Sequence, residues 1–417
     1  MNFKSFNFHP DVAAGVATAG YVTPTPIQDQ AIPQILKNRD VMGLAQTGTG
    51  KTAAFALPIL NRLMGKKTGR IRALIVAPTR ELAEQIHQAI EALGRKTPMS
   101  STTVYGGVNI NPQIQKLKRA DIVVACPGRL LDHISRHTVD LSQVEVLVID
   151  EADQMFDMGF LPDIRRILTH LPKKRQTLLF SATMPAEIRR LAGDILRDPT
   201  TVQVGVTAPA DTVRHALYPV AQHLKTALLL KLLENTTAES VLVFTRTKHR
   251  AKSLGNKLAV AGFRSTSLQG NLSQGRRQAA LEGFRDGTFQ ILVATDIAAR
   301  GIDVTQISHV INYDIPSTPE AYIHRIGRTG RATRSGEAFT LITGDDNDMV
   351  RAINRTIGTP IERRTLADFD YNAGSLTPQR RDSPRARGHQ TQKNKPTHEP
   401  RGRARKGAFA WLSPQGT

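Results

Sequence analysis

Cysteine is almost absent from this chain of 417 residues, which contains Cys126 and no other. One thiol cannot form an intramolecular disulfide or a cysteine-based zinc cluster, so the sequence favours a reducing compartment. Long apolar runs are missing too. No stretch approaches the ~18 apolar residues of a membrane span, and the first residues lack the apolar core of a signal peptide. We therefore expect a cytoplasmic protein without a membrane partner.

Acidic residues are scarce relative to basic ones, because 36 Asp and Glu stand against 56 Lys and Arg, for a net charge of +20. This charge attracts polyanions, so nucleic acid is the leading expected partner, although composition alone also allows a merely soluble basic protein. Residues 372–417 contain ten of the basic and two of the acidic residues, so they carry +8 and residues 1–371 carry +12. Both parts of the chain are basic.

The length and the 40% hydrophobic content allow two or three domains. Short runs rich in Val, Ile and Leu alternate with helical stretches, which is typical of buried parallel strands. These runs are 73–77, 122–125, 144–149, 178–180, 241–244, 291–294, 309–312 and 338–342. We predict an α/β fold of two doubly wound domains, 1–208 and 209–371, with a boundary near Pro209 in a small, polar linker. The Pro-, Arg-, Gln- and Gly-rich segment 372–417 predicts a disordered basic tail.

A phosphate-binding loop is predicted between a candidate strand and a helical pattern. Its glycines let backbone N–H groups turn toward phosphate oxygens, and the following helix N-terminus favours negative charge. Lys51 can reach the outer phosphates of a nucleotide, and the Thr52 hydroxyl can bind Mg²⁺. Ala45 replaces the leading glycine of the stricter pattern. The loop comprises Ala45, Gln46, Thr47, Gly48, Thr49, Gly50, Lys51 and Thr52.

Two acids follow the predicted strand 144–149, at the end of a parallel sheet where ligands bind. Asp150 is expected to hold Mg²⁺ through water, and Glu151 to orient or deprotonate the water that attacks the phosphate. An isolated Asp-Glu pair is usually a solvated turn. The apolar strand before it and the phosphate loop upstream favour the catalytic interpretation.

These segments and other short motifs, in the same order, resemble the DEAD-box RNA helicases over residues 1–345. The resemblance implies two RecA-like domains that bind ATP and Mg²⁺. The segment 20–28 resembles the family's adenine-reading Q motif. By this resemblance Phe3, Tyr21 and Gln28 contact adenine, because an aromatic ring can stack on the base and an amide can pair with its edge.

The resemblance also implies an RNA-binding surface formed by loops of both halves. Such loops contact the sugar-phosphate backbone, so little sequence specificity is expected. Cys126 departs from the family, which usually has Thr there, and the substitution removes a hydroxyl donor. Ser181-Ala182-Thr183 resembles the motif that couples hydrolysis to strand separation. The implied RNA-binding residues are Pro78, Thr79, Arg80, Gly106, Gly107, Gly128, Arg129, Thr245, Arg246, Gly270, Thr295 and Arg300.

The second half is implied to complete the ATP site when the two domains close. Asp303 would meet the ribose, and Arg328 and Arg331 would act as arginine fingers on the γ-phosphate. His324 would link this segment to Asp150-Glu151-Ala152-Asp153. ATP and RNA would then each favour the closed state, and a strand bent by closure could not stay paired.

Two other functions stay open from the sequence. A DNA helicase shares the two-domain plan but typically lacks the Asp-Glu-Ala-Asp and adenine-reading segments. An RNA clamp controlled by ATP would grip RNA without separating duplexes. The basic tail should add salt-sensitive RNA affinity, or dock a protein through Phe409, Trp411 and Leu412. Its shortness resembles the bacterial RhlE-like subgroup, which suggests a monomer that acts on ribosome precursors or with RNA decay machinery.

Overall fold

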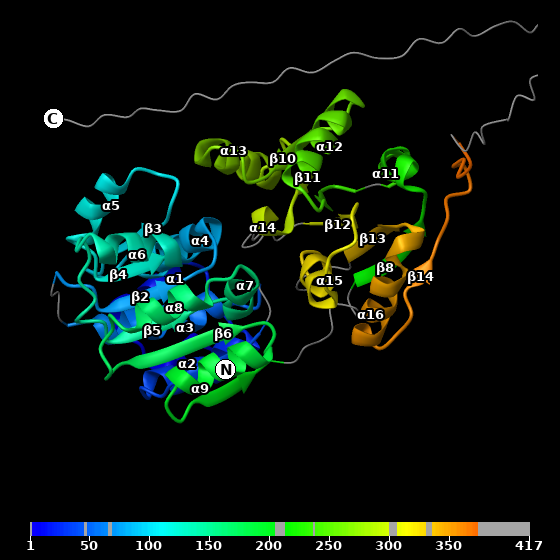
Figure 1. Cartoon of the computed structure of the whole chain (residues 1–417). Coiled ribbons are helices and arrows are strands. Elements are labelled where there is room, and N and C mark those ends of the chain that lie inside the picture. The colour runs from blue at the N-terminus through cyan, green and yellow to red at the C-terminus, as the bar shows by residue number, and fades with distance from the viewer. Residues whose placement is uncertain are drawn as a thin grey trace, which may run out of the picture. The chain divides into compact units, whose positions relative to one another are not determined.

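A computed structural model describes residues 2–45, 48–65, 69–204, 213–236, 238–299, 307–330 and 336–373. The chain divides into two units, Met1–Tyr371 and Asn372–Thr417. Apart from its first two residues, the tail expected from the sequence lies outside the described residues, as does the expected boundary at Pro209. The first unit contains two β-sheets with their helices (Figure 1).

The first sheet has seven parallel strands in the order β3-β4-β2-β5-β6-β1-β7. The central strands are buried along their whole length, which explains their unbroken apolar sequence. The strands are β1 (Val41–Leu44), β2 (Ala73–Val76), β3 (Ser101–Val104), β4 (Ile122–Ala125), β5 (Val146–Ile149), β6 (Gln176–Ser181) and β7 (Thr200–Gln203).

Helices cover both faces of this sheet. One core contains side chains of η1 (Phe3–Phe6), α1 (Pro10–Thr18), α2 (Pro26–Leu36), α3 (Lys51–Leu63) and α4 (Arg80–Leu93). The other core contains side chains of α5 (Ile110–Leu117), α6 (Pro127–Ser135), α7 (Ala152–Asp157), α8 (Leu161–Leu168) and α9 (Ala186–Ile195). Among the described helices of the whole chain, none has the length and apolarity needed to cross a membrane.

The second sheet is also parallel and has the order β10-β11-β9-β12-β13-β8-β14. Its strands are β8 (Val213–Pro219), β9 (Val241–Phe244), β10 (Ser265–Leu268), β11 (Ile291–Ala294), β12 (His309–Asn312), β13 (Gly336–Ile342) and β14 (Glu362–Arg363). Its helices are η2 (Gln222–Leu224), α11 (Lys225–Glu234), α12 (Lys248–Val260), α13 (Gln274–Arg285), α14 (Asp296–Ala299), α15 (Pro319–Ile326), η3 (Gly344–Asp346) and α16 (Asn347–Ile357). We call the two sheets with their helices the first and the second domain.

The two sheets repeat one topology, since each strand of the second takes the place of the strand seven positions earlier. This arrangement confirms the α/β class with two doubly wound domains. All eight expected strands are present, with bounds that differ by a few residues. The edge strand β10 was not among the predicted strands, because its Ser and Thr residues interrupt the apolar run.

The sequence Lys-Thr-Ala begins the first helix after the first strand in both domains, at Lys51 and at Lys225. Lys225 is buried and donates to the carbonyl oxygens of Tyr313 and Leu341, each at 3.2 Å. It also lies 4.0 Å from the carboxylate of Asp346. In the second domain this lysine therefore connects the ends of neighbouring strands. Only the first domain has a glycine-rich loop before the helix.

Replacing Lys225 with Met is expected to destabilise the protein by about 3 kcal/mol, because two carbonyls and the partly buried Asp346 carboxylate lose their cation. Urea unfolding followed by circular dichroism measures this change. Lys231→Met on the same helix is the matched control, since Lys231 is partly exposed and its pair with Glu234 contributes little. Equal unfolding curves for the two variants would contradict the role given to Lys225.

Candidate functional site

The phosphate loop predicted from the sequence follows β1 and leads into α3. Gly48 and Gly50 have φ angles of 86° and 94°, a region that glycine adopts without strain. Lys51 is buried at the first position of α3, and its Nζ donates to the carbonyl of Ala45 at 3.0 Å. The same nitrogen lies 3.9 Å from Asp150 Oδ1. Gln46 and Thr47, also predicted here, lie outside the described residues.

Gln28 is joined to this loop. Its amide oxygen accepts from the Thr25 N–H at 2.9 Å, and its Nε2 donates to the carbonyl of Gly50 at 3.1 Å. The side chain is 2% exposed. An adenine that pairs with this amide must therefore compete with the bond to Gly50, which connects base recognition to the shape of the phosphate loop.

Gly50→Ala is expected to raise the Kd for ATP at least about tenfold. A Cβ at this position would lie 2.5 Å from Gln28 Nε2 and 2.9 Å from Thr25 Oγ1, and the φ of 94° is itself unfavourable for alanine. Titration calorimetry with ATP measures the effect. Gly193→Ala is the control, because a Cβ there meets nothing within 4 Å. Unchanged ATP affinity in Gly50→Ala would show that the loop does not hold the nucleotide in this shape.

Asp150 and Glu151 follow β5, as predicted, and both are buried. Burial raises the pKa of Asp150 to about 6, the positive charge of Lys51 lowers it, and the Glu151 charge raises it. The Glu151 N–H donates to Asp150 Oδ1 at 3.0 Å. Glu151 has a φ of 54°, a strained angle for a non-glycine residue. Two carboxylates are thus held beside the phosphate loop.

Two predicted aromatic residues lie near the start of the chain. The Phe3 ring is buried and packs edge-on against Tyr21, with 5.7 Å between ring centroids, and against Phe6 at 5.8 Å. Tyr21 is 37% exposed. Tyr21 is therefore the ring that a base can reach in this structure, and Phe3 supports it from the protein side.

Asp153 connects the carboxylate segment to Ser181-Ala182-Thr183. One of its oxygens, Oδ2, accepts from the N–H of Ala182 at 3.1 Å, the N–H of Thr183 at 2.8 Å and the Thr183 hydroxyl at 2.9 Å. The Asp153 N–H in turn donates to Ser181 Oγ at 3.2 Å. A movement of either segment must therefore move the other.

The second domain contributes His324 and Arg328 to this region. His324 Nε2 lies 3.9 Å from Asp153 Oδ2, the same oxygen that holds Thr183. Burial lowers the pKa of His324, and the charge of Asp153 partly offsets this. Arg328 is buried and lines a pocket of about 230 Å³ together with Gln154, Asp157 and His324. The predicted Arg331 and Asp303 lie outside the described residues.

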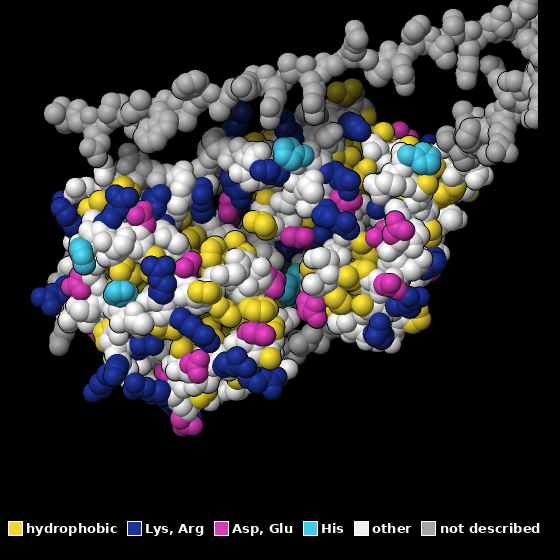
Figure 2. All heavy atoms as spheres, viewed as in Figure 1, with side chains coloured by type: hydrophobic (Ala, Val, Ile, Leu, Met, Phe, Trp, Pro, Cys, Tyr) yellow, Lys and Arg dark blue, Asp and Glu magenta, His cyan; other side chains and the backbone are white. Residues whose placement is uncertain are grey.

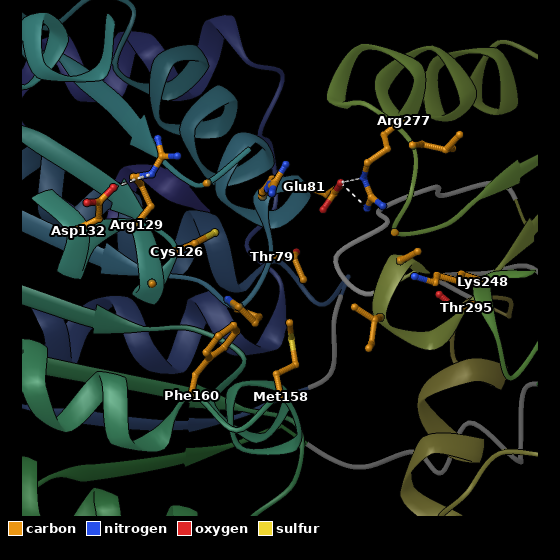
Figure 3. Close-up of a pocket in the computed structure, with 18 of the residues that line it drawn as sticks. Thr79, Glu81, Cys126, Arg129, Asp132, Met158, Phe160, Lys248, Arg277 and Thr295 are labelled. Carbon is orange, nitrogen blue, oxygen red and sulfur yellow. Dashed lines mark hydrogen bonds and ion pairs between the residues drawn. The ribbon is translucent and has the colours of Figure 1, made fainter. Parts of the chain in front are cut away.

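A second pocket, of about 700 Å³, gathers most of the predicted RNA-binding residues (Figure 3). We call it the groove. The labelled Thr79, Cys126 and Arg129 come from the first domain and Thr295 from the second, while Met158 and Phe160 form another side. The predicted residues that line the groove are Pro78, Thr79, Arg80, Gly106, Gly128, Arg129, Arg246, Gly270 and Thr295.

Among the described residues, two predicted RNA contacts, Thr245 and Gly107, do not line the groove. Thr245 is fully buried. Gly107 packs against Arg80, where a Cβ would lie 2.2 Å from Nη1, so this glycine makes room for the arginine. Arg300 lies outside the described residues. In this arrangement Thr245 is therefore covered by its own domain, and Gly107 leaves space for the Arg80 guanidinium.

Two side-chain contacts cross the groove between the domains. Glu81 Oε1 accepts from Arg277 at 2.8 Å from Nε and 2.6 Å from Nη2 (Figure 3), and Arg80 Nη1 donates to Gln274 Oε1 at 3.3 Å. Both residues lie in segments that resemble the family's RNA-binding loops, but neither was predicted as a contact residue. No local pattern in the sequence marks this pair, because the two residues are 196 positions apart in the chain.

Arg325 was also overlooked, although it joins three loops of the second domain. It donates to both carboxylate oxygens of Asp296, at 2.6 and 2.7 Å, and to the carbonyl of Asp314 at 2.7 Å. The Asp314 carboxylate accepts from the Arg246 N–H at 2.8 Å. The groove residues Thr295 and Arg246 are thereby connected to the helix that carries His324.

Cys126 lines the groove at the position where the resembled family usually has Thr, so a hydroxyl donor is absent there. Burial raises the pKa of its thiol to about 12, so the side chain stays neutral. Cys126→Thr is expected to raise affinity for single-stranded RNA about fivefold, because a hydroxyl can donate to phosphate. Fluorescence anisotropy measures the change. Cys126→Val, which has the shape of Thr without the hydroxyl, should give no gain, and a gain in Val equal to that in Thr would contradict the explanation.

Comparisons with known proteins agree with this geometry. Residues 25–191 match the family model "DEAD/DEAH box helicase", and residues 224–333 match "Helicase conserved C-terminal domain". The chain is 42% identical to the DEAD-box ATP-dependent RNA helicase CshA of Bacillus subtilis over 372 residues, which cover 89% of this chain and 75% of CshA. It is also 42% identical to RhpA of Helicobacter pylori over 373 residues, with 89% and 75% covered.

A solved structure has the same fold. Dbp5 of S. cerevisiae, bound to RNA and ADP BeF3, superimposes with a TM-score of 0.79 at 32% identity, over 87% of this chain and 95% of Dbp5. The two parallel sheets are thus tandem RecA-like domains. The motifs, the fold and the identity over most of each relative lead to one conclusion: this chain belongs to the DEAD-box family of ATP-dependent RNA helicases.

Proposed function

We propose a division of work in which the first domain binds and activates ATP and the second supplies the arginine charge for hydrolysis. As a DEAD-box helicase, the chain hydrolyses ATP and acts on RNA. The observation that carries the residue roles is the placement of His324 beside Asp153 and of Arg328 beside Gln154, which brings second-domain side chains to the carboxylate segment. Lys51 binds the outer phosphates, and Glu151 orients or deprotonates the attacking water.

Mg²⁺ fits the residues beside the phosphate loop. Asp150 supplies a buried carboxylate, and Thr52 supplies a hydroxyl in the first turn of α3, and both are oxygen donors of the kind Mg²⁺ prefers. The ion neutralises charge on the phosphates when bound. Asp150 and Thr52 would hold the ion, and Lys51, with its Nζ 3.9 Å from Asp150 Oδ1, balances the charge of the carboxylate.

The adenine base stacks on Tyr21 and pairs with the Gln28 amide. Phe3 acts by fixing the Tyr21 ring. When adenine replaces the Gly50 carbonyl as the partner of Gln28 Nε2, the phosphate loop is released from this contact. Binding of the adenine base can thereby change the conformation of the loop that holds the phosphates.

The groove holds single-stranded RNA through its sugar-phosphate backbone. Arg80, Arg129 and Arg246 provide cations for phosphates, and Gly106, Gly128 and Gly270 allow the backbone to come close. Because both domains line the groove, closure by ATP bends the strand and separates short duplexes, or remodels RNA-protein complexes. Asp153 transmits the change between the ATP site and Ser181-Ala182-Thr183.

Steady-state ATP hydrolysis with no nucleic acid, with single-stranded RNA and with single-stranded DNA tests this function. We expect stimulation by RNA alone, together with displacement of short duplexes that requires ATP. Equal stimulation by DNA would indicate a general nucleic-acid translocase. RNA binding with ATP but without duplex displacement would indicate a clamp.

The finer assignments made from the sequence are also proposals. They comprise the boundary between the domains near Pro209, a tail from residue 372 that tethers RNA, the RhlE-like subgroup, a cytoplasmic monomer, and a role in ribosome assembly or RNA decay. The relatives compared are named CshA and RhpA, so membership of the RhlE-like subgroup rests on the short basic tail alone. RNA affinity and its salt dependence, compared between the full chain and one ending at residue 371, test the tether.

A further inference from the structure

The amino ends of the first sheet form a surface that none of the proposed roles uses. Asp40, just before β1, is buried, and its carboxylate accepts from the Thr177 N–H and from the Arg197 N–H, each at 2.8 Å. Arg197 Nη2 also donates to the Lys173 carbonyl at 2.6 Å. These bonds hold together three loops, at 37–40, 172–177 and 197–198.

The three loops carry six cations, which we call the amino-edge cluster. Its members are Lys37, Arg39, Lys173, Lys174, Arg175 and Arg197. All are exposed except Arg175, which is partly buried. The exposed acid of these loops is Asp198, which lies 3.6 Å from Arg39 with its side chain 99% exposed, so it neutralises little of the charge. Asp40 is occupied by backbone N–H groups.

The cations of this cluster also affect each other. Burial lowers the pKa of Arg175, the nearby positive charge of Arg197 lowers it further, and the negative charge of Asp40 partly offsets this. Arg175 Nη1 donates to the Pro172 carbonyl at 2.7 Å, while its buried Nε has no acceptor among the described residues. The loops therefore hold like charges close together, where a polyanion would relieve their repulsion.

The cluster lies at the opposite end of the sheet from the groove. The groove residues Pro78, Gly106 and Cys126 follow the carboxyl ends of β2, β3 and β4. The cluster residues precede the amino ends of β1, β6 and β7. The strands are parallel, and β6 alone spans about 20 Å at ~3.3 Å per residue. RNA that contacts both surfaces must therefore extend from one end of the sheet to the other.

Further arginines extend this charge over the neighbouring helices. Arg165, Arg166, Arg189 and Arg190 lie exposed on α8 and α9, the helices that lead into β6 and β7. Arg165 and Arg166 face acids at 3.7 and 3.8 Å, whereas no described acid pairs with Arg189 or Arg190. Figure 2 shows dark-blue side chains, with a few acids among them, over the region where Figure 1 labels α8 and α9.

We propose that the amino-edge cluster is a second RNA-binding surface, which holds the phosphate backbone of a structured segment adjoining the single strand in the groove. The inference rests on RNA being the ligand of the groove. An acidic protein partner is disfavoured, because the exposed large apolar residues of the described chain, Tyr21, Val22, Val108, Val260 and Ile297, all lie outside these loops. Protein interfaces usually need apolar or aromatic anchors, whereas phosphate contacts need cations alone.

The triple variant Lys37→Ala, Lys173→Ala and Lys174→Ala tests this surface in the full chain. These side chains make no hydrogen bond or ion pair with described residues, so the Asp40 contacts should persist. The matched control is Lys231→Ala, Arg351→Ala and Arg355→Ala, which removes the same charge from α11 and α16. Two RNAs are compared: a single strand of about six nucleotides, and the same strand joined to a duplex of about 20 base pairs.

We expect the triple variant to bind the longer RNA about tenfold more weakly than the control, and the slope of log K against log salt to fall by about 2 to 3. Binding of the short strand, and ATP hydrolysis stimulated by it, should match the control. Equal affinity and equal slope for the longer RNA would overturn the second surface. Failure of the proposed function would give a different result, because the short strand would then not stimulate ATP hydrolysis even in the unaltered chain.

Discussion

Replacing Glu151 with Gln is expected to lower RNA-stimulated ATP hydrolysis by about 10²- to 10⁴-fold. Glu151 is buried after β5, next to Asp150, and the amide of Gln fills the same space but cannot accept a proton. Lys51, Asp150 and the phosphate loop are unchanged, so ATP should still bind. Steady-state phosphate release at saturating RNA measures the fall, and titration calorimetry measures ATP binding.

The control for this variant is Glu187→Gln, which makes the same chemical change at an exposed position of α9. Its hydrolysis rate should equal that of the unaltered chain. A Glu151→Gln rate within about tenfold of the original would show that another group positions the water. Loss of ATP binding together with hydrolysis would instead point to a disturbed turn, since Glu151 holds a φ of 54°.

Arg328→Lys is expected to lower kcat by about 10²- to 10³-fold while the KM for ATP changes little. The buried guanidinium of Arg328 belongs to the second domain and lines a pocket with His324 and with Gln154 of the first domain. It can therefore approach the γ-phosphate only when the second domain lies against the first. Lysine keeps the positive charge but loses the planar group that contacts two oxygens at once. The loss therefore falls on the transition state more than on substrate binding.

Single-turnover hydrolysis at saturating RNA separates this effect from product release. Arg214→Lys, at an exposed position of β8, should leave the rate unchanged. A raised KM with an unchanged kcat in Arg328→Lys would mean that the arginine binds ATP equally in the ground and transition states. That outcome would contradict the role of an arginine finger.

The predicted phosphate loop follows from the sequence more directly than the predicted RNA groove. The loop is local, because one segment supplies the glycines, the helix start and Lys51. Asp150 and Glu151 were singled out because they follow a buried parallel strand, and ligands of open parallel sheets bind outside the carboxyl ends of the strands. The cross-domain pair of Glu81 and Arg277 has no such local signal, since the two residues become neighbours only when two sheets are folded and brought together.

The exposure of the predicted RNA contacts also depends on the tertiary structure. The packing of the second domain buries Thr245 completely, whereas the neighbouring Arg246 lines the groove. Whether a loop residue faces solvent or core depends on the helices that cover the strand. Those contacts come from distant parts of the chain.

The sequence by itself determined the α/β class, the central strands, the nucleotide chemistry and the attraction to RNA, because apolar runs, glycine spacing and net charge act locally or additively. Tertiary structure decided what depends on distant neighbours. It set the edge strand β10, the choice of Tyr21 over Phe3 as the accessible ring, and the connection of Asp153 to Thr183. It also gave the two Lys-Thr-Ala helix starts different roles. A lysine at the start of a helix can face a phosphate site, or it can donate to carbonyls at the strand ends of its domain. The surrounding loops decide which of these occurs.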